Sequence, residues 1–180
     1  MPGFTLSGDG KNVPELAAPP VGLATAVEYY NATFSHYFIT ANADEIAKLD
    51  AGIISGWQRT GLSFSVYTTA APGTVAVCRF FSASFAPKSS HFYAPRGLGC
   101  EAVLGSPIWQ FEGDVFYTAL PDAAGVCPAG NVPVYRLYNN GQSGAQNHRF
   151  TISAAVQLDM IAEGYIPEGS GTEVGMCSPN

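Results

Sequence analysis

The sequence VPVYRLYNN at residues 132–140, followed by NHRFT at residues 147–151, sets the pattern for most of this chain. Altered versions of the first stretch occur earlier, as VEYYN at 27–31 and CRFFS at 78–82, and SHFY at 90–93 resembles the second. Aromatic residues alternate in these stretches and turn residues bound them, which predicts pairs of consecutive strands.

The three histidines of the chain give the spacing of these stretches. They are separated by 55 and 57 residues, and each has an aromatic residue two places later: His36 with Phe38, His91 with Tyr93, and His148 with Phe150. Further on, an aromatic residue precedes a glycine by four places in each copy: Trp57 and Gly61, Trp109 and Gly113, Tyr165 and Gly169. The recurring order predicts three copies of a unit of roughly fifty residues.

These landmarks place the expected boundaries. Residues 1–26 contain four prolines and four glycines, and we expect them to form an N-terminal linker or extension. The rest, 27–180, is then a single domain of three repeats, at 27–71, 75–121 and 132–180.

Each unit is predicted to contain two strands, a helix and two further strands. Asn42, together with Glu45 three places later, and Ser153 are the expected helix caps of the outer copies. The expected buried stripes are Ile46, Leu49 and Ile53 in the first copy, and Val156 and Met160 in the third. The middle copy has Pro95, Gly97 and Gly99 at this point, so its helix is expected to be short or absent.

One such unit cannot bury its hydrophobic face alone, whereas three units packed around a common axis can. The expected fold is mainly β with short helices: three β-β-α-β-β repeats in a closed pseudo-threefold assembly, either trefoil-like or a three-bladed propeller. The helix in each unit counts against a plain trefoil.

Four cysteines without C-x-x-C spacing favour disulfides over a zinc site. The pairing Cys78–Cys100 and Cys127–Cys177 is preferred because neither bond then joins two different repeats. Four free thiols in a cytosolic protein are the alternative. Disulfides favour a secreted or periplasmic location.

The composition narrows the choice of partners. The net charge is −6 and only 12% of residues are charged, which argues against nucleic acid. No apolar run approaches the ~18 residues of a membrane span, so no membrane partner is expected. Residues 1–26 lack the features of a signal peptide, so an export signal would have been removed or would lie on a longer parent chain.

The runs VPVYRLYNN, NHRFT and SHFY resemble a repeat family of secreted bacterial proteins known only as domain of unknown function 5648. The resemblance covers nearly everything from Val27 to Cys177. It implies export and a role accessory to extracellular hydrolases, and it supplies no catalytic residues. Glu28 departs from the pattern, where the other copies have Arg79 and Arg136, so a site using that arginine exists at most twice.

His36, His91 and His148 allow three interpretations. A threefold axis could gather them into a zinc site. A structural histidine that fixes a turn through a backbone hydrogen bond is favoured over a ligand-binding one, and metal comes last. We expect neither a metal nor a cofactor.

Aromatic residues supply the candidate ligand-binding surface, because flat rings with polar tips stack against sugars. Tyr37 and Tyr93 near the histidines are expected to face the solvent, with Arg149 in that place in the third copy. The residues expected to face the core are Trp57, Trp109 and Tyr165. Arg79 and Arg136 are expected to form ion pairs; the candidate partners are Glu112, Glu168 and Asp114.

No G-x-S-x-G, H-E-x-x-H or phosphate-loop motif is present. The expected function is a non-catalytic secreted accessory module that binds carbohydrate or another extracellular polymer. One alternative is a structural or protein-interaction module of a larger exported enzyme, with the catalytic domain covalently linked. The other is a hydrolase of unrecognised type.

Overall fold

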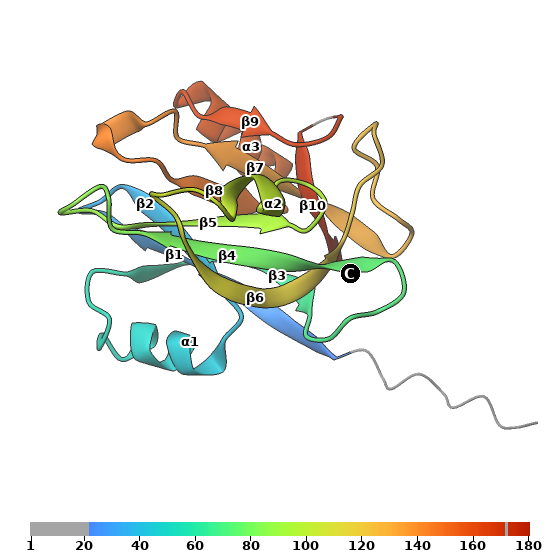
Figure 1. Cartoon of the computed structure of the whole chain (residues 1–180), viewed down its shortest axis with the longest axis horizontal. Coiled ribbons are helices and arrows are strands. Elements are labelled where there is room, and N and C mark those ends of the chain that lie inside the picture. Colours follow the sequence, from blue (N-terminus) through green and yellow to red (C-terminus); the bar gives the residue numbers. More distant parts are fainter. Residues whose placement is uncertain (1–21, 172) are drawn as a thin grey trace, which may run out of the picture.

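In the computed structural model, residues 22–171 and 173–180 are described, and they form one antiparallel sheet of ten strands with short helices (Figure 1). The expected mainly β fold is confirmed. Most of the expected linker lies outside the described residues, and the first strand begins at Leu23, inside that segment. Among the described residues, no helix is long and apolar enough to cross a membrane.

The strands fall into three successive units. The first unit contains β1 (Leu23–Asn31), β2 (His36–Thr40), α1 (Ala43–Asp50) and β3 (Gln58–Tyr67). The second contains β4 (Thr74–Ser82), β5 (Ser90–Pro95), α2 (Cys100–Val103) and β6 (Gln110–Ala119). The third contains β7 (Asn131–Tyr138), the 3-10 turn η1 (Gln142–Gly144), β8 (His148–Thr151), α3 (Ala154–Ala162), β9 (Ile166–Glu168) and β10 (Val174–Pro179). In each unit the first strand lies between the second strand and the strands that follow the helix.

The expected pair of strands after each helix is corrected in two units. In the first and second units these segments form one continuous strand, β3 or β6. Gly61 and Gly113 adopt positive φ angles of 87° and 130° inside these strands, where the register with the neighbouring strand shifts. A glycine at a bulge bends a strand without ending it. Only the third unit keeps two separate strands, β9 and β10.

The helices follow their predicted caps. The Asn42 side chain accepts hydrogen bonds from the N–H groups of Asp44 and Glu45 in α1, and the Ser153 hydroxyl accepts one from the N–H of Val156 in α3. Leu49 is buried as expected, but Ile53 is 74% exposed because α1 ends at Asp50. In the second unit α2 is a single short turn, as expected.

The last strands of the three units meet in the middle of the molecule. β6 forms bridges to both β3 and β10, and the Ser178 hydroxyl of β10 donates to the carbonyl of Ser65 on β3 at 2.9 Å. Buried side chains from all three units fill the space beside this junction: Ile39, Phe64, Tyr93, Phe116, Phe150 and Met176. Each large apolar side chain buried there contributes about 1.5–3 kcal/mol.

The expectation of a closed assembly is wrong for the sheet, which is open. The strand order runs β2-β1-β3-β6-β10-β7-β8, with β4 and β5 branching from β6 and β9 paired to β7. No ladder joins the end strands β2 and β8 within the described chain. A side chain links β2 to the third unit instead. The Asn147 amide accepts a hydrogen bond from the N–H of Tyr37 at 2.7 Å and donates one to the carbonyl of Tyr37 at 3.0 Å.

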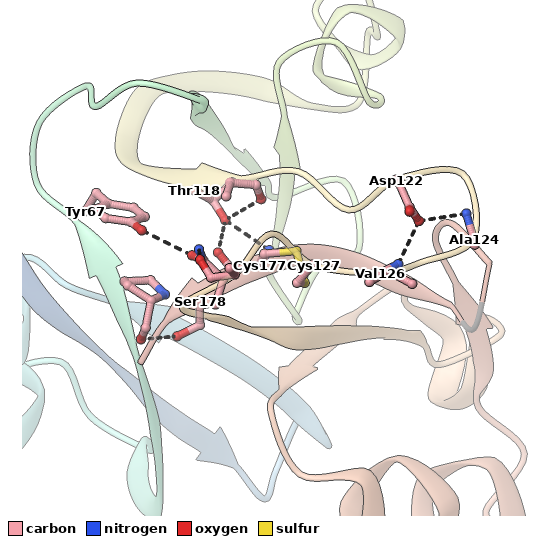
Figure 2. The surroundings of a disulfide bond; sticks show 12 residues. Tyr67, Thr118, Asp122, Ala124, Val126, Cys127, Cys177 and Ser178 are labelled. Carbon is pink, nitrogen blue, oxygen red and sulfur yellow. Dashed lines mark hydrogen bonds between the residues drawn. A yellow bond between two sulfur atoms is a disulfide. The ribbon is translucent and has the colours of Figure 1, made fainter.

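Both expected disulfides are present, Cys78–Cys100 and Cys127–Cys177. The first attaches α2 to β4. The second attaches the segment before β7 to β10, and the Thr118 hydroxyl donates to the carbonyl of Cys177 beside it at 2.7 Å (Figure 2). Each bond therefore fixes a segment outside the regular strands onto the sheet.

Candidate functional site

Two of the three histidines occupy equivalent places. His91 on β5 lies opposite Phe81 on β4, and His148 on β8 lies opposite Tyr138 on β7. Both imidazoles reach a carboxylate with their Nε2 atom. The strand pairing therefore puts His91 and His148 at corresponding positions of their units, as expected.

The prediction that His36 occupies the same position as His91 and His148 is wrong. It lies opposite Asn31, and Tyr37 lies opposite Tyr30, the counterpart of Phe81. A shift of one residue along a strand turns a side chain to the other face. Tyr37 therefore takes the place of the histidine. His36 is fully buried with its Nδ1 atom 2.8 Å from the carbonyl of Ser89, which fits the structural role favoured from the sequence.

A pocket of about 220 Å³, called here the first pocket, lies between the first and second units. Its lining combines aromatic rings with an arginine, a histidine and two carboxylates. The lining residues are Phe38, Glu45, Leu49, Ile54, Trp57, Arg79, Phe81, Ser89, His91 and Glu112.

A pocket of about 430 Å³, called here the second pocket, lies between the second and third units. Its lining residues are Phe92, Gly99, Ala102, Val103, Trp109, Arg136, Tyr138, Gln146, His148 and Glu168. Strand register makes Trp109 the counterpart of Trp57, since Gln58 and Gln110, which follow them, lie opposite Tyr30 and Phe81. The two pockets therefore share a tryptophan, an arginine, a glutamate and a histidine at corresponding positions.

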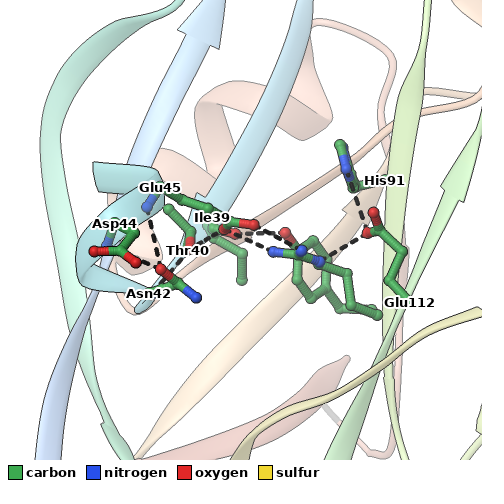
Figure 3. Close-up of polar contacts among 9 residues, drawn as sticks. Ile39, Thr40, Asn42, Asp44, Glu45, His91 and Glu112 are labelled. Carbon is green, nitrogen blue, oxygen red and sulfur yellow. Dashed lines mark hydrogen bonds and ion pairs between the residues drawn. The ribbon is translucent and has the colours of Figure 1, made fainter. Parts of the chain in front are cut away.

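Arg79 is the polar centre of the first pocket. Its terminal nitrogens bond both oxygens of Glu45, each at 2.8 Å, and its Nε atom bonds Glu112 at 2.8 Å. Glu45 and Glu112 close this network from opposite sides, and His91 reaches Glu112 at 3.5 Å (Figure 3). Burial opposes the charge of Arg79, but the carboxylates outweigh it and raise the pKa of the guanidinium.

Burial also governs His91. It lowers the pKa of the imidazole to about 3, with the charge of Arg79 acting in the same direction. His91 is therefore neutral at neutral pH. The first pocket then holds one cation and two anions, Glu45 and Glu112.

Arg136 is the polar centre of the second pocket and has fewer partners. Its Nε atom is 3.1 Å from Glu168, whose carboxylate also lies 3.2 Å from His148. The guanidinium lies over the ring of Phe92 at 5.7 Å, as that of Arg79 lies over Phe38 at 5.9 Å. Burial lowers the pKa of Arg136, and Glu168 only partly offsets this effect. The ion pairs expected for Arg79 and Arg136 are thus present, with Glu112 and Glu168 as partners, whereas the third candidate, Asp114, pairs with Arg96.

A further cavity of about 400 Å³, the connecting pocket, shares lining residues with both sites. Phe81 belongs to it and to the first pocket, and Trp109 belongs to it and to the second. The connecting pocket therefore borders one ring of each of the other two pockets.

The boundary between the third and first units is occupied by an ion pair. Arg149 on β8 bonds both oxygens of Glu28 on β1 at 2.9 Å, and its guanidinium lies 4.1 Å from the ring centre of Tyr37. The side chains are only 10% and 2% exposed. The expected solvent exposure of Arg149 is wrong, because the carboxylate of Glu28 draws it into this boundary.

The remaining candidates divide between core and surface. Tyr93 was expected to face the solvent and is buried instead, packed against Phe116 and Phe150 with its hydroxyl donating to the carbonyl of Ile39. Tyr165 is buried as expected, while Trp57 and Trp109 are partly exposed in the pockets. Within the described ranges, no three potential metal ligands gather at one point.

Sequence reasoning missed two contributors to the pockets. Glu45 was assigned to the helix cap, although its side chain binds Arg79 and Thr40. Phe38 and its counterpart Phe92 form the wall under each arginine. Their aromatic character was visible in the sequence, but their contact with the next unit was not.

Comparison with known proteins gives one positive result. A family model described as "Domain of unknown function (DUF5648)" matches residues 2–119 and residues 101–175. No curated protein matches, and no solved structure matches. The matched residues cover most of the chain, so this protein belongs to the domain of unknown function family DUF5648.

Proposed function

We propose that this domain is a non-catalytic, exported module that binds carbohydrate or another extracellular polymer in the first and second pockets. The observation that carries the proposal is the repetition of one set of side chains at two places. Each pocket pairs a tryptophan with further rings and with an arginine–glutamate–histidine cluster. Rings that stack on sugar faces, next to groups that hydrogen-bond hydroxyls, are the chemistry that sugar recognition needs.

The connecting pocket favours an extended ligand over a single small molecule. It borders Phe81 and Trp109, so a polymer seated in one pocket can continue past these rings to the other. Two linked sites raise the overall affinity above that of either one. The two disulfides support export, because such bonds persist in oxidising compartments.

The units are also proposed to be related by an approximate threefold rotation. Support comes from contacts that follow one another around the molecule. Phe38 contacts His91 at 4.6 Å, Phe92 contacts His148 at 4.8 Å, and Arg149 lies over Tyr37. Each contact joins a unit to the next, and the last one returns to the first unit, so side chains close a ring that the open sheet does not.

Binding to a panel of polysaccharides tests the function, with Trp57→Ala and Trp109→Ala as variants. Each substitution is expected to weaken binding about tenfold, because one stacking platform is lost. The double variant is expected to bind no polymer. Phe111→Ala is the matched control, since Phe111 is an exposed ring outside both pockets.

Two results would reverse the proposal. Silence across the panel, together with recovery of a specific protein partner, would favour a structural or protein-interaction module. Turnover of ester, glycoside or peptide substrates would favour a hydrolase.

A further inference from the structure

The second pocket differs from the first in one respect that points to its ligand. Resting on the proposed function, we infer that the second pocket binds an acidic sugar, a uronic acid residue of a polysaccharide, and that Arg136 holds its carboxylate. The first pocket, in which Arg79 already holds a carboxylate of the protein, is not expected to prefer acidic sugars.

The two arginines have matching surroundings. Arg79 lies opposite Tyr93 on the neighbouring strand, and Arg136 lies opposite Phe150 at the same place in its unit. Each guanidinium covers a phenylalanine ring of the preceding unit and faces a glutamate that also contacts a histidine. A comparison with the first pocket therefore shows which partner of the arginine is absent from the second pocket.

The missing element is a carboxylate on the helix side. In the first pocket α1 supplies Glu45, which binds both terminal nitrogens of Arg79. At the second pocket the corresponding helix α2 has a single turn, and it contributes Ala102 and Val103 to the lining. Among the described residues, Glu168 is the one carboxylate paired with Arg136.

Arg136 is thus a half-buried cation that is short of acceptors. Its side chain is 16% exposed, and its buried Nε–H makes no hydrogen bond of good geometry despite the nearby Glu168. Guanidinium groups bind carboxylates through two parallel hydrogen bonds, as Arg79 does with Glu45. A ligand carboxylate at Arg136 would make the same pair.

The charged groups of the second pocket are compatible with a bound uronate. With neutral His91, the first pocket carries one guanidinium and two carboxylates. A bound uronate would give the second pocket the same balance, with Arg136, Glu168 and the ligand in these roles. The remaining lining, with Phe92, Trp109 and Tyr138, favours a sugar ring over a bare inorganic anion. A volume of about 430 Å³ lies within the range of small-molecule sites.

The two tryptophans of the chain allow each pocket to be observed separately, because Trp57 lines the first and Trp109 the second. Indole N–H signals of ¹⁵N-labelled protein would be followed by NMR during titration with galacturonate oligomers, matched galactose oligomers, and inorganic phosphate. We expect the Trp109 signal to move at a galacturonate concentration at least tenfold lower than for galactose. Phosphate is expected to have little effect.

Arg136→Gln is expected to abolish this tenfold preference while leaving the galactose response in place. Arg136→Lys should retain part of it, since charge remains without the paired donors. Arg59→Gln removes an exposed arginine outside both pockets; it is the matched control and should leave the Trp109 response unchanged. Thermal melts would establish that each variant is folded.

The outcomes separate the two proposals. Equal binding of acidic and neutral oligomers, an unchanged preference in a folded Arg136→Gln protein, or an equal response to phosphate would overturn the uronate inference and leave carbohydrate binding intact. If no oligomer of this titration or of the polysaccharide panel moves either indole signal, the proposed carbohydrate binding itself is wrong.

Discussion

The boundary between the third and first units contrasts with the two boundaries that contain pockets. At the pocketed boundaries the arginine and its strand glutamate belong to the same unit, as with Arg79 and Glu112. At the third boundary Arg149 and Glu28 come from opposite sides, 121 residues apart in the chain. Where the arginine and the glutamate come from different units, a buried ion pair between the first and third units occupies the boundary. Where they come from the same unit, the boundary contains a cavity.

Arg149→Met, at the boundary between the third and first units, should lower the free energy of unfolding more than any other change considered. It leaves Glu28 buried without its cation, which typically costs about 3–5 kcal/mol. Chemical denaturation would measure the loss of unfolding free energy. The double variant Glu28→Gln/Arg149→Met should recover much of it, and Arg59→Ala, at the exposed pair with Asp50, should change stability little. A double variant as unstable as the single one would contradict the explanation.

Removing the Cys78–Cys100 disulfide should sharpen the comparison between the two pockets. A separation of 22 residues corresponds to about 3 kcal/mol on the chain-entropy model. Because α2 borders only the second pocket, Cys78→Ala/Cys100→Ala should broaden the indole NMR signal of Trp109 and leave that of Trp57 sharp. Equal broadening of both signals would mean that the bond supports the whole fold.

Acid should weaken the fold through its histidines. Burial lowers the pKa values of His36, His91 and His148 below their ordinary value of 6.5, so the unfolded chain binds protons that the folded protein does not. Stability is then complete above pH 6.5 and falls as the pH drops, by up to about 1.4 kcal/mol per pH unit for each histidine.

Denaturation at several values between pH 6.5 and pH 4.5 would measure this slope. The lowered pKa values of Glu45 and Glu168 affect stability mainly below their ordinary value of 4.5, so the histidines dominate the slope in the upper part of that window. His91→Gln should reduce the slope by the contribution of one proton. An unchanged slope would show that His91 titrates alike in both states.

The smallest expected effect concerns the helix that supplies Glu45. Asn42→Ala removes the acceptor for two N–H groups of α1 and should cost about 1 kcal/mol. Ser153→Ala is the matched change at α3, where the cap accepts one such bond, and its effect should be smaller. Thermal denaturation would compare them, and a larger loss for Ser153→Ala would contradict this ranking.

Several features of the site were predictable and others were not. The arginine–glutamate pairs and the limit of two arginine-based sites followed from the aligned stretches, because paired strands bring such positions together. The shift of His36 did not, since His36 fits the pattern of a histidine with an aromatic residue two places later. Only the pairing with β1 shows that Tyr37 takes this place. The role of Glu45 was hidden because a glutamate at this place also fits a helix cap.

The sequence alone indicated the strand-rich units and the helix caps and favoured the cysteine pairing, because these depend on residues that are close in the chain. The tertiary structure decided which faces meet, and with them the open sheet, the burial of Tyr93 and the pockets. Those features depend on contacts such as Arg149 with Glu28, whose partners lie in different units. Local patterns indicate which segments form a strand pair, but they do not specify what the next unit places against it.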